Sequence, residues 1–200
     1  MARYTGPKRK LSRREGVALF AKDAAFIERK GAVIPGFHGT RRARKQSEYG
    51  LQLREKQKAK RMFGLMERQF ANYVKKANKS RGNTGEKLLS LLETRLDNVI
   101  YRLGFSSSRA FARQIVSHGH VSVDSKKVTI PSYQLKLGAT VAILGKMSDN
   151  TEVRKSLSSD VTLPEWLERK AIVGKVLRLP KRDEMEQGIN EKLIVEYYSR

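Results

Sequence analysis

Residues 88–104, LLSLLETRLDNVIYRLG, carry the clearest structural signal in the chain. Their apolar side chains recur at spacings of three and four residues, which is the pattern of an amphipathic helix with one buried face. Asn83, followed three residues later by Glu86, is typical of a helix start, and Gly104 is typical of a helix end. We therefore predict one helix that ends at Gly104. Its apolar face consists of Leu88, Leu92, Leu96, Val99 and Leu103.

The following residues predict a second helix and then a small sheet. A shorter helix is expected over 109–117, with Gly119 at its end. The apolar period then changes to two, which is typical of strands with one buried face. We predict a tight turn at Asp124-Ser125 between the first two strands. The alternating apolar residues are Val121, Val123, Val128, Ile130, Val141 and Ile143.

The flanking regions have different patterns. Residues 1–46 are basic and contain several turn signals, so a surface arm is expected there. Residues 47–77 have a helical period that Gly64 divides, and their apolar stripe is predicted to lie in a core. Residues 176–179 and 193–198 are predicted as strands. The fold class predicted for the whole chain is α+β.

Positive charge is large and unevenly distributed. The chain has 200 residues, with 42 Lys and Arg against 20 Asp and Glu, and a formal net charge of +22. Residues 1–90 hold 24 basic and 7 acidic residues, residues 91–155 hold 10 and 5, and residues 156–200 hold 8 of each. A compact protein repels itself at this charge unless a polyanion neutralises it, and nucleic acid does so with release of counterions. We therefore predict nucleic-acid binding, chiefly through the first 90 residues.

The candidate phosphate ligands follow the helical period. Arg54, Lys58 and Arg61 lie at i, i+4 and i+7, so they share a helix face. The basic residues between positions 41 and 61 are opposed only by Glu48 and Glu55, which favours a phosphate-binding surface over a merely solvated one. The predicted RNA-binding residues of this half are Arg3, Lys8, Arg9, Lys10, Arg13, Arg14, Arg41, Arg42, Arg44, Lys45, Arg54, Lys56, Lys58, Arg61 and Arg68.

The sequence gives little support for catalysis, nucleotide binding or a metal site. The chain has no cysteine, which excludes disulfides and cysteine-based zinc sites. Segment 82–88 lacks the spacing of a phosphate-binding loop. His118 and His120 have no third ligand nearby in sequence, so phosphate contact or packing is favoured over a metal site. We predict no enzyme activity, no cofactor, no metal and no small-molecule substrate.

No signal peptide is visible, and no stretch approaches the ~20 apolar residues that a membrane span needs. A soluble intracellular protein without membrane contacts is expected.

Sequence blocks in the same order over nearly the whole chain resemble the ribosomal protein S4 family of the small subunit, of the bacterial and organellar type. One block alone would be weak, but their number and order make the resemblance specific. The blocks are ARYTGP (2–7), LSRREG (11–16), LREKQK (53–58), ERQF (67–70), LLETRLDNVIYRLGF (91–105) and INEKLIVEYYSR (189–200).

The resemblance implies a domain organisation. Residues 91–155 would be the S4 RNA-binding module, whose helix pair and small sheet present a basic face to structured RNA. Residues 1–46 would be a basic arm, and residues 47–90 a helical domain that continues with 156–200. The strands and turns of 156–200 would pack back on the helical body. By similarity to the module's core motif, the implied RNA contacts are Arg109, Arg113, His118, Lys126 and Lys127.

The resemblance also implies a function. The chain would be a structural constituent of the small ribosomal subunit that binds 16S rRNA at a multi-helix junction and nucleates assembly of the subunit body. Ribosomal protein S5 would contact its neutral C-terminal part. Arg41, Arg42, Arg44 and Lys45 resemble basic residues that border the channel through which mRNA enters, which implies a contribution to translational accuracy. The expected location is the cytoplasmic ribosome, with an organellar ribosome left open.

Three departures from the family pattern stand out. Many relatives carry four cysteines in the first 40 residues and bind zinc, but Arg9 and Ser12 stand at the first two of these positions, so the arm's fold must depend on packing and RNA. The usual Asn-Gly at the sheet turn is Asp124-Ser125 here, which predicts a looser hairpin or another turn type because Ser tolerates positive φ less well than Gly. The family's Pro-Gly-Gln-His-Gly segment carries Phe37 in place of Gln.

Two other function classes remain open at the level of sequence. The first is an RNA-modifying enzyme with an S4 module as an appendage, although residues 1–90 and 156–200 are short for a catalytic domain. The second is a general nucleic-acid condenser, which would bind duplex DNA as tightly as folded rRNA.

Overall fold

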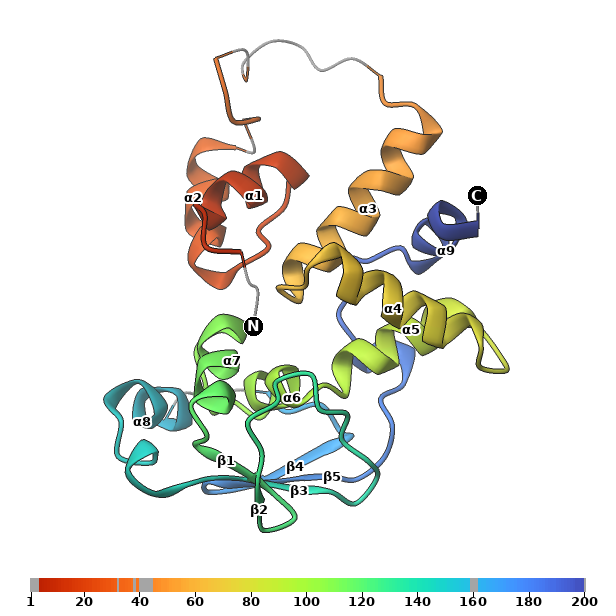
Figure 1. Cartoon of the computed structure of the whole chain (residues 1–200). Coiled ribbons are helices and arrows are strands. Elements are labelled where there is room, and N and C mark those ends of the chain that lie inside the picture. The colour runs from red at the N-terminus through yellow and green to blue at the C-terminus, as the bar shows by residue number, and fades with distance from the viewer. Residues whose placement is uncertain (1–3, 32, 38, 40–44, 159–161, 200) are drawn as a thin grey trace. The chain divides into compact units, whose positions relative to one another are not determined.

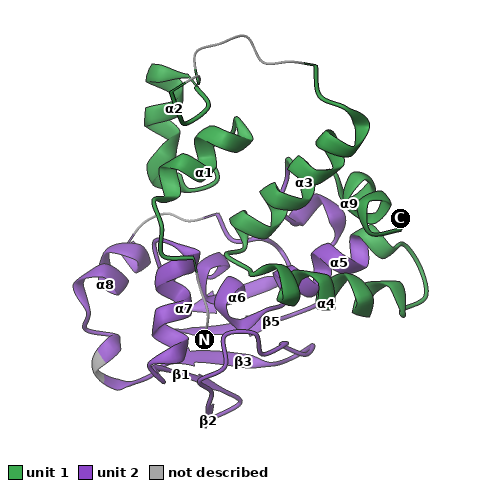
Figure 2. Ribbon diagram, turned by 45° about the horizontal axis from the view of Figure 1, so that its top comes forward, with its two compact units in different colours: residues 1–85, 188–200 green, residues 86–187 purple. Residues whose placement is uncertain are grey.

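The computed structural model describes residues 4–31, 33–37, 39, 45–158 and 162–199, which form two compact units (Figures 1 and 2). The first unit consists of residues 1–85 and 188–200, and the second of residues 86–187. The first unit is helical, whereas the second combines helices with an antiparallel sheet. The predicted α+β class is confirmed.

Helices and one 3-10 turn build the first unit. They are α1 (Lys8–Glu15), η1 (Ala21–Asp23), α2 (Ala24–Lys30), α3 (Glu48–Met62), α4 (Glu67–Asn78) and α9 (Glu191–Ser199). The helix α5 (Thr84–Glu93) begins at the end of this unit and continues into the second.

The second unit contains the remaining elements. They are α6 (Leu96–Arg102), α7 (Arg109–Ser117), β1 (Val121–Val123), β2 (Lys126–Lys127), β3 (Thr140–Ile143), η2 (Gly145–Met147), α8 (Thr151–Ser158), β4 (Leu167–Lys170), β5 (Val173–Val176) and η3 (Arg182–Glu184).

The helical pattern of residues 47–77 is confirmed. Ser47 caps α3 by accepting a hydrogen bond from the Gly50 amide, and Gly64, at φ +64°, separates α3 from α4. The predicted apolar stripe, which consists of Met62, Met66, Phe70, Tyr73 and Ala77, is buried except at Met66.

The strand predicted at 193–198 is wrong, because these residues lie in α9. Asn190 precedes this helix, and its side-chain oxygen accepts a hydrogen bond from the Lys192 amide. Ile194 is fully buried, and the Tyr198 ring lies 6.2 Å from the Phe70 ring of α4. A short apolar run fits a strand and a buried helix equally well, and packing against α3 and α4 decides for the helix.

The helix predicted to run unbroken to Gly104 is two helices, because the chain leaves helical geometry at Thr94 and Arg95. The Leu96 amide donates to the Tyr133 carbonyl, and the Leu135 amide donates to the Thr94 carbonyl, at 2.9 and 3.0 Å. Arg95 is itself almost fully buried. A later segment of the chain therefore supplies the hydrogen bonds that an uninterrupted helix would have made internally.

The sheet has five strands in the order β2-β1-β3-β5-β4, all antiparallel. In Figure 1 helices α6 and α7 lie on one side of it. The predicted strands at 121–123 and 141–143 are confirmed, but the return strand is the pair Lys126–Lys127 rather than the segment around Val128 and Ile130.

The predicted tight turn is present. Asp124 and Ser125 have φ of +48° and +65°, so both central residues adopt the positive φ that a type I′ hairpin requires. The Asp124 carboxylate accepts a hydrogen bond from the Thr140 amide at 2.8 Å, which ties the turn to β3. The hairpin thus keeps its geometry without the usual glycine.

The C-terminal quarter divides differently from the prediction. The strand predicted at 176–179 is wrong except at Val176, because the strand β5 spans Val173–Val176 and residues 177–179 lie outside it. Val141 of β3 pairs with Gly174 of β5, so β4 and β5 extend the sheet of the second unit instead of packing on the helical body. Of this quarter, residues 188–200 belong to the first unit. The second unit begins at Glu86, earlier than the predicted start at residue 91.

Candidate nucleic-acid interface

The N-terminal arm is a small packed structure that presents cations. Ser12 is fully buried and donates a hydrogen bond to Asp23 at 2.5 Å, which joins α1 to the η1 turn. The Arg9 guanidinium lies 4.6 Å from the centre of the Phe26 ring, and the Lys8 ammonium lies 5.6 Å from that of Phe20. Both cations are exposed, and each makes a cation–π contact with an aromatic ring of the arm.

Other arm residues have different environments. Lys10 and Arg14 are exposed, whereas Arg13 is half-buried and donates to the Val33 carbonyl at 2.8 Å, which holds α1 against the segment that follows α2. Lys45 is described and exposed. The predicted residues that lie outside the described ranges are Arg3, Arg41, Arg42 and Arg44.

Helix α3 carries the predicted basic face, but its cations are not equivalent. Arg54 and Arg61 both donate to the carboxylate of Glu15 at the end of α1. Lys58 pairs with Glu55 on the same helix at 3.1 Å. All three cations are partly buried, so the face is held in place by protein carboxylates.

Lys56 points into the protein. Its side chain is 5 % exposed, its ammonium lies 2.9 Å from Glu67, and it sits 4.6 Å from the centre of the Tyr197 ring. Lys56 therefore connects α3 to α4 and α9, and we leave it out of the proposed interface.

Glu67 is the centre of this connection. Burial alone would raise its pKa, but hydrogen bonds from Lys60, Lys56 and Tyr198 lower the pKa of Glu67 to about 2. Burial, together with the hydrogen bond to Glu67, raises the pKa of the Tyr198 hydroxyl. The charged carboxylate and the neutral phenol are thus the stable forms.

Helix α4 exposes a polar and basic stripe that the sequence reasoning largely missed. Arg68, Asn72, Lys75 and Lys79 are exposed and spaced by three and four residues, opposite the buried apolar stripe. Only Arg68 was among the predicted residues. The sequence could have predicted this stripe, because the helical period that identifies the buried face of α4 also identifies the exposed face opposite it.

In the second unit two predicted arginines lie within the protein. Arg109 donates to Glu186 and, at 2.8 Å, to Asn98, and its guanidinium lies 4.7 Å from the centre of the Tyr101 ring. Arg113 is 8 % exposed on the inner side of α7. Both residues connect parts of the module, and we do not include them in the proposed interface.

Their neighbour Glu93 connects several segments of this region. This fully buried carboxylate accepts hydrogen bonds from Asn98, from Arg102 and from the Glu186 amide. Burial disfavours the charged form of Arg102, but its hydrogen bonds to Glu93, together with the negative charges of Glu93 and Glu186, outweigh burial and raise the pKa of Arg102. Charged groups buried this deeply are tolerated only when they are paired in this way.

The end of α7 and the sheet turn carry the remaining candidates. His118, Lys126 and Lys127 are all exposed. Gly119 has φ +75°, and a side chain there would collide with that of Lys127, so the glycine lets Lys127 lie against the end of α7. A basic tip is thereby formed, which we define as His118, Lys126 and Lys127.

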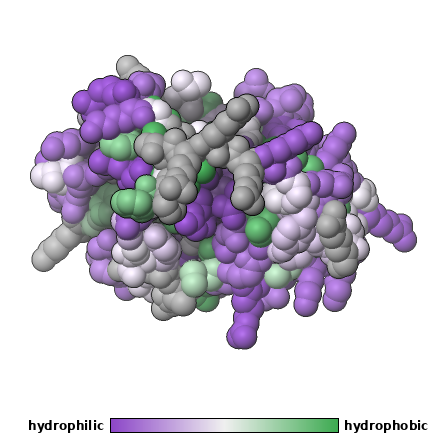
Figure 3. Space-filling view, turned by 90° about the horizontal axis from the view of Figure 1, so that it is seen from above, coloured by the Kyte–Doolittle hydropathy of each residue, from purple (hydrophilic) through white to green (hydrophobic). Residues whose placement is uncertain are grey.

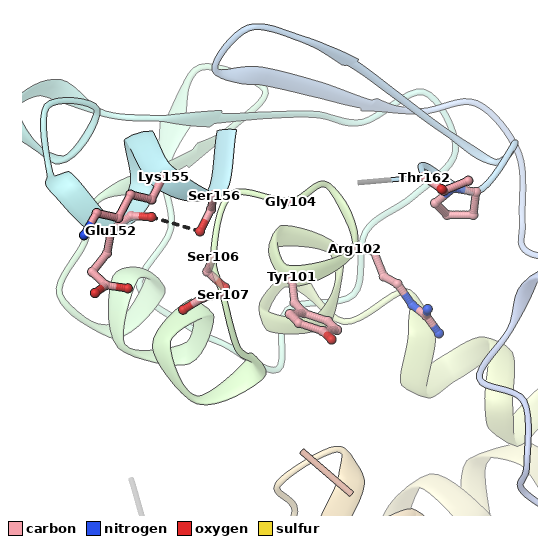
Figure 4. Close-up of a pocket in the computed structure, with 10 residues that line it drawn as sticks. Tyr101, Arg102, Gly104, Ser106, Ser107, Glu152, Lys155, Ser156 and Thr162 are labelled. Carbon is pink, nitrogen blue, oxygen red and sulfur yellow. Dashed lines mark hydrogen bonds between the residues drawn. The ribbon is translucent and has the colours of Figure 1, made fainter. Parts of the chain in front are cut away.

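Further features of the described residues limit the alternatives. The second unit has an open cavity of about 480 Å³ near Tyr101, Ser106 and Ser156, where Ser156 donates to the Glu152 carbonyl at 2.9 Å (Figure 4). None of the predicted RNA-binding residues lines it. No group of three or more potential metal-ligating side chains occurs in the described ranges. Each described helix is too short or too polar to cross a bilayer.

The described surface is predominantly hydrophilic on the face drawn in Figure 3. Cations supported by aromatic rings, paired arginines and a basic tip are the features of proteins that bind polyanions. The class that fold and surface define is a two-unit nucleic-acid-binding protein.

Comparison with known proteins specifies this class. The family model described as ribosomal protein S4/S9 N-terminal domain matches residues 3–93, and that described as S4 domain matches residues 94–141. The small ribosomal subunit protein uS4 of Dictyoglomus turgidum is 54 % identical over 207 residues, and that of Polaromonas naphthalenivorans is 50 % identical over 207 residues. Both alignments cover 100 % of this chain and of the relative.

The chain belongs to the uS4 family of small ribosomal subunit proteins. The resemblance inferred from the sequence blocks is confirmed. The chain is accordingly a structural ribosomal protein with an RNA-binding S4 domain and not an enzyme, as predicted, which removes the RNA-modifying alternative.

Proposed function

We propose that this protein binds 16S rRNA directly where several RNA helices meet, and that this binding nucleates assembly of the body of the small subunit. Folded RNA is recognised largely through its backbone geometry and 2′-hydroxyls. A protein that binds one junction geometry lowers the free energy of that geometry, and later components can recognise it. The function is therefore scaffolding.

The observation that carries the proposal is the presence of cations on both units. The first unit exposes Lys8, Arg9, Lys10, Arg14 and Arg68, and the second exposes the basic tip. Two basic units suit an RNA with more than one helix better than a single uniform duplex, since each unit can bind a different helix. The proposed contacts are completed by the exposed Lys45 and by the partly exposed Arg13, Arg54, Lys58 and Arg61. Arg3, Arg41, Arg42 and Arg44 remain predicted contacts.

A competition titration at fixed salt tests the proposal. The purified chain is titrated with labelled 16S junction fragments against scrambled transcripts of equal length and against duplex DNA. We expect the native junction to bind at least about tenfold more tightly than either competitor, because only it offers the required backbone geometry. Equal affinity for all three would instead indicate a general condenser and would overturn the proposal.

The proposed function includes two finer contacts. We propose that the neutral C-terminal part contacts ribosomal protein S5, and that Arg41, Arg42, Arg44 and Lys45 border the path of entering mRNA and so affect translational accuracy. The support is the resemblance of these residues to the family pattern, together with the even charge balance of residues 156–200. Binding of purified ribosomal protein S5 to the preformed protein–RNA complex would support the first contact, and absence of binding would contradict it.

A further inference from the structure

Glu15, at the end of α1, is a buried carboxylate that holds two arginines of α3. Its side chain is 1 % exposed. Arg54 and Arg61 donate from their Nη1 atoms to the same oxygen, Oε1, and the Arg54 distance is 3.3 Å. The other oxygen, Oε2, is buried and has no hydrogen-bond partner among the residues that the structure describes. One carboxylate therefore fixes two guanidiniums that lie seven residues apart on one helix face.

The way these arginines bind Glu15 leaves their most useful donors unoccupied. A guanidinium binds a phosphate best through a pair of N–H groups, because they match two phosphate oxygens at once. In Arg54 and Arg61, Glu15 engages only Nη1, and no protein group within the described ranges accepts a hydrogen bond from Nε or Nη2. Both side chains remain partly exposed, at 31 % and 17 %. Each arginine thus keeps an edge that fits a phosphate.

Glu15 and the arginines around it form a cluster, and the single negative charge of Glu15 does not balance their positive charge. This one carboxylate faces Arg54 and Arg61, and Arg14 is close enough to favour its charged form as well. Without Glu15, the two guanidiniums would repel each other and spread into solvent. With it, the cluster retains excess positive charge in a defined position.

Burial disfavours the charged form of Glu15. Burial raises the pKa of Glu15 despite the nearby arginines, and burial also lowers the pKa of Arg61. Both directions mean that the folded protein disfavours these charges relative to water. Buried ion pairs are in general weak sources of stability. A buried carboxylate whose charge is disfavoured is better explained by its geometry, which fixes two arginines, than by a gain in folding stability.

We propose that Glu15 positions Arg54 and Arg61 as a two-arginine clamp for a phosphodiester of folded RNA. Glu15 is a positioning residue, since it touches the arginines and not the RNA. The inference rests on the proposed RNA-binding function and specifies which residue organises one of its contacts.

Substitution of Glu15 separates positioning from simple electrostatics. Glu15→Gln preserves the shape of the side chain and removes its charge. If charge alone mattered, affinity for every RNA would rise, because the protein becomes more positive. The clamp predicts instead that affinity for the 16S junction fragment falls roughly tenfold, as expected for a charge-assisted phosphate contact, while affinity for scrambled transcripts does not fall.

A matched control makes the comparison sharp. Glu28 is exposed on α2, in the same basic part of the chain, and Glu28→Gln produces the same change in net charge. We expect this variant to bind both RNAs as tightly as the unsubstituted protein, or slightly more tightly. If Glu15→Gln behaves like Glu28→Gln, the positioning role is refuted.

Charge-conserving variants test the clamp without relying on Glu15. Arg54→Lys and Arg61→Lys keep the cation but lose the planar pair of donors. We expect each to weaken junction binding severalfold with an unchanged salt slope, and circular dichroism melting to show a folded protein. Junction binding equal to that of the unsubstituted protein in both variants would also refute the clamp. If the unsubstituted protein itself shows no preference for the junction, the proposed function fails, which is a distinguishable result.

Discussion

Ser125 lies at the second central position of the turn between β1 and β2, with a φ of +65°. This left-handed conformation costs a non-glycine L-residue about 1–2 kcal/mol. Glycine would remove this cost but lose about 0.5–1 kcal/mol through its greater freedom in the unfolded chain. We expect Ser125→Gly to raise the free energy of unfolding by about 0.5–1 kcal/mol, as measured by urea denaturation.

Asp124 provides the control at the same turn. It also has positive φ, but its carboxylate accepts the hydrogen bond from the Thr140 amide. Asp124→Gly relieves the strain and loses that bond, which is worth about 0.5–1.5 kcal/mol. It should therefore leave stability nearly unchanged or lower it. A Ser125→Gly protein no more stable than Asp124→Gly would contradict this account of the turn.

At the level of elements, α9 is held to α3 and α4 by the Glu67 carboxylate. Because the pKa of Glu67 is about 2 in the folded protein and near 4.5 when unfolded, its contribution to stability is complete above pH 4.5 and is lost as the pH falls towards 2. With about half of the side chain exposed to solvent, we expect the contribution to be about 1–2 kcal/mol. Thermal unfolding at a series of pH values from neutral down towards the pKa of Glu67 measures it.

The expected signature is a difference between two variants. Glu67→Gln should destabilise the protein at neutral pH and show a weaker loss of stability on acidification than the unsubstituted chain. Glu48→Gln, at an exposed position in the first turn of α3, should keep the full acid dependence. Identical acid dependence in the Glu67→Gln protein would show that this carboxylate does not hold α9 in place.

The elements differ in how far the sequence predicts them. The helix over 109–117 and the division at Gly64 follow from local period and from glycine, so they are predictable. The break at Arg95 depends on hydrogen bonds to the distant segment around Tyr133, and the helical state of 193–198 depends on contacts with α3 and α4. Local sequence carries no information on such partners, which is why both predictions failed.

The same limit applies to the candidate site. Periodicity correctly placed Arg54 and Arg61 on one face of α3, but it could not show that a carboxylate of α1 holds them. It also could not distinguish the buried Lys56 from its neighbours, because the burial arises from Glu67 and Tyr197 on other helices. Charge and period predict that a face is basic, whereas tertiary contacts decide which cations remain available.

At the scale of the whole molecule, positive charge lies on both units. We therefore expect both units to contribute to the salt dependence of the affinity for RNA. Each phosphate contact adds about 0.7–0.9 to the slope of log affinity against log salt. The double variant Lys126→Ala and Lys127→Ala should therefore lower the slope for 16S junction RNA by about 1.4–1.8. The matched control removes two exposed lysines from the opposite half of the same sheet, Lys170 of β4 and Lys175 of β5, and should change the slope less. Equal slopes for the two double variants would mean that the second unit adds only diffuse charge and that its tip makes no phosphate contact.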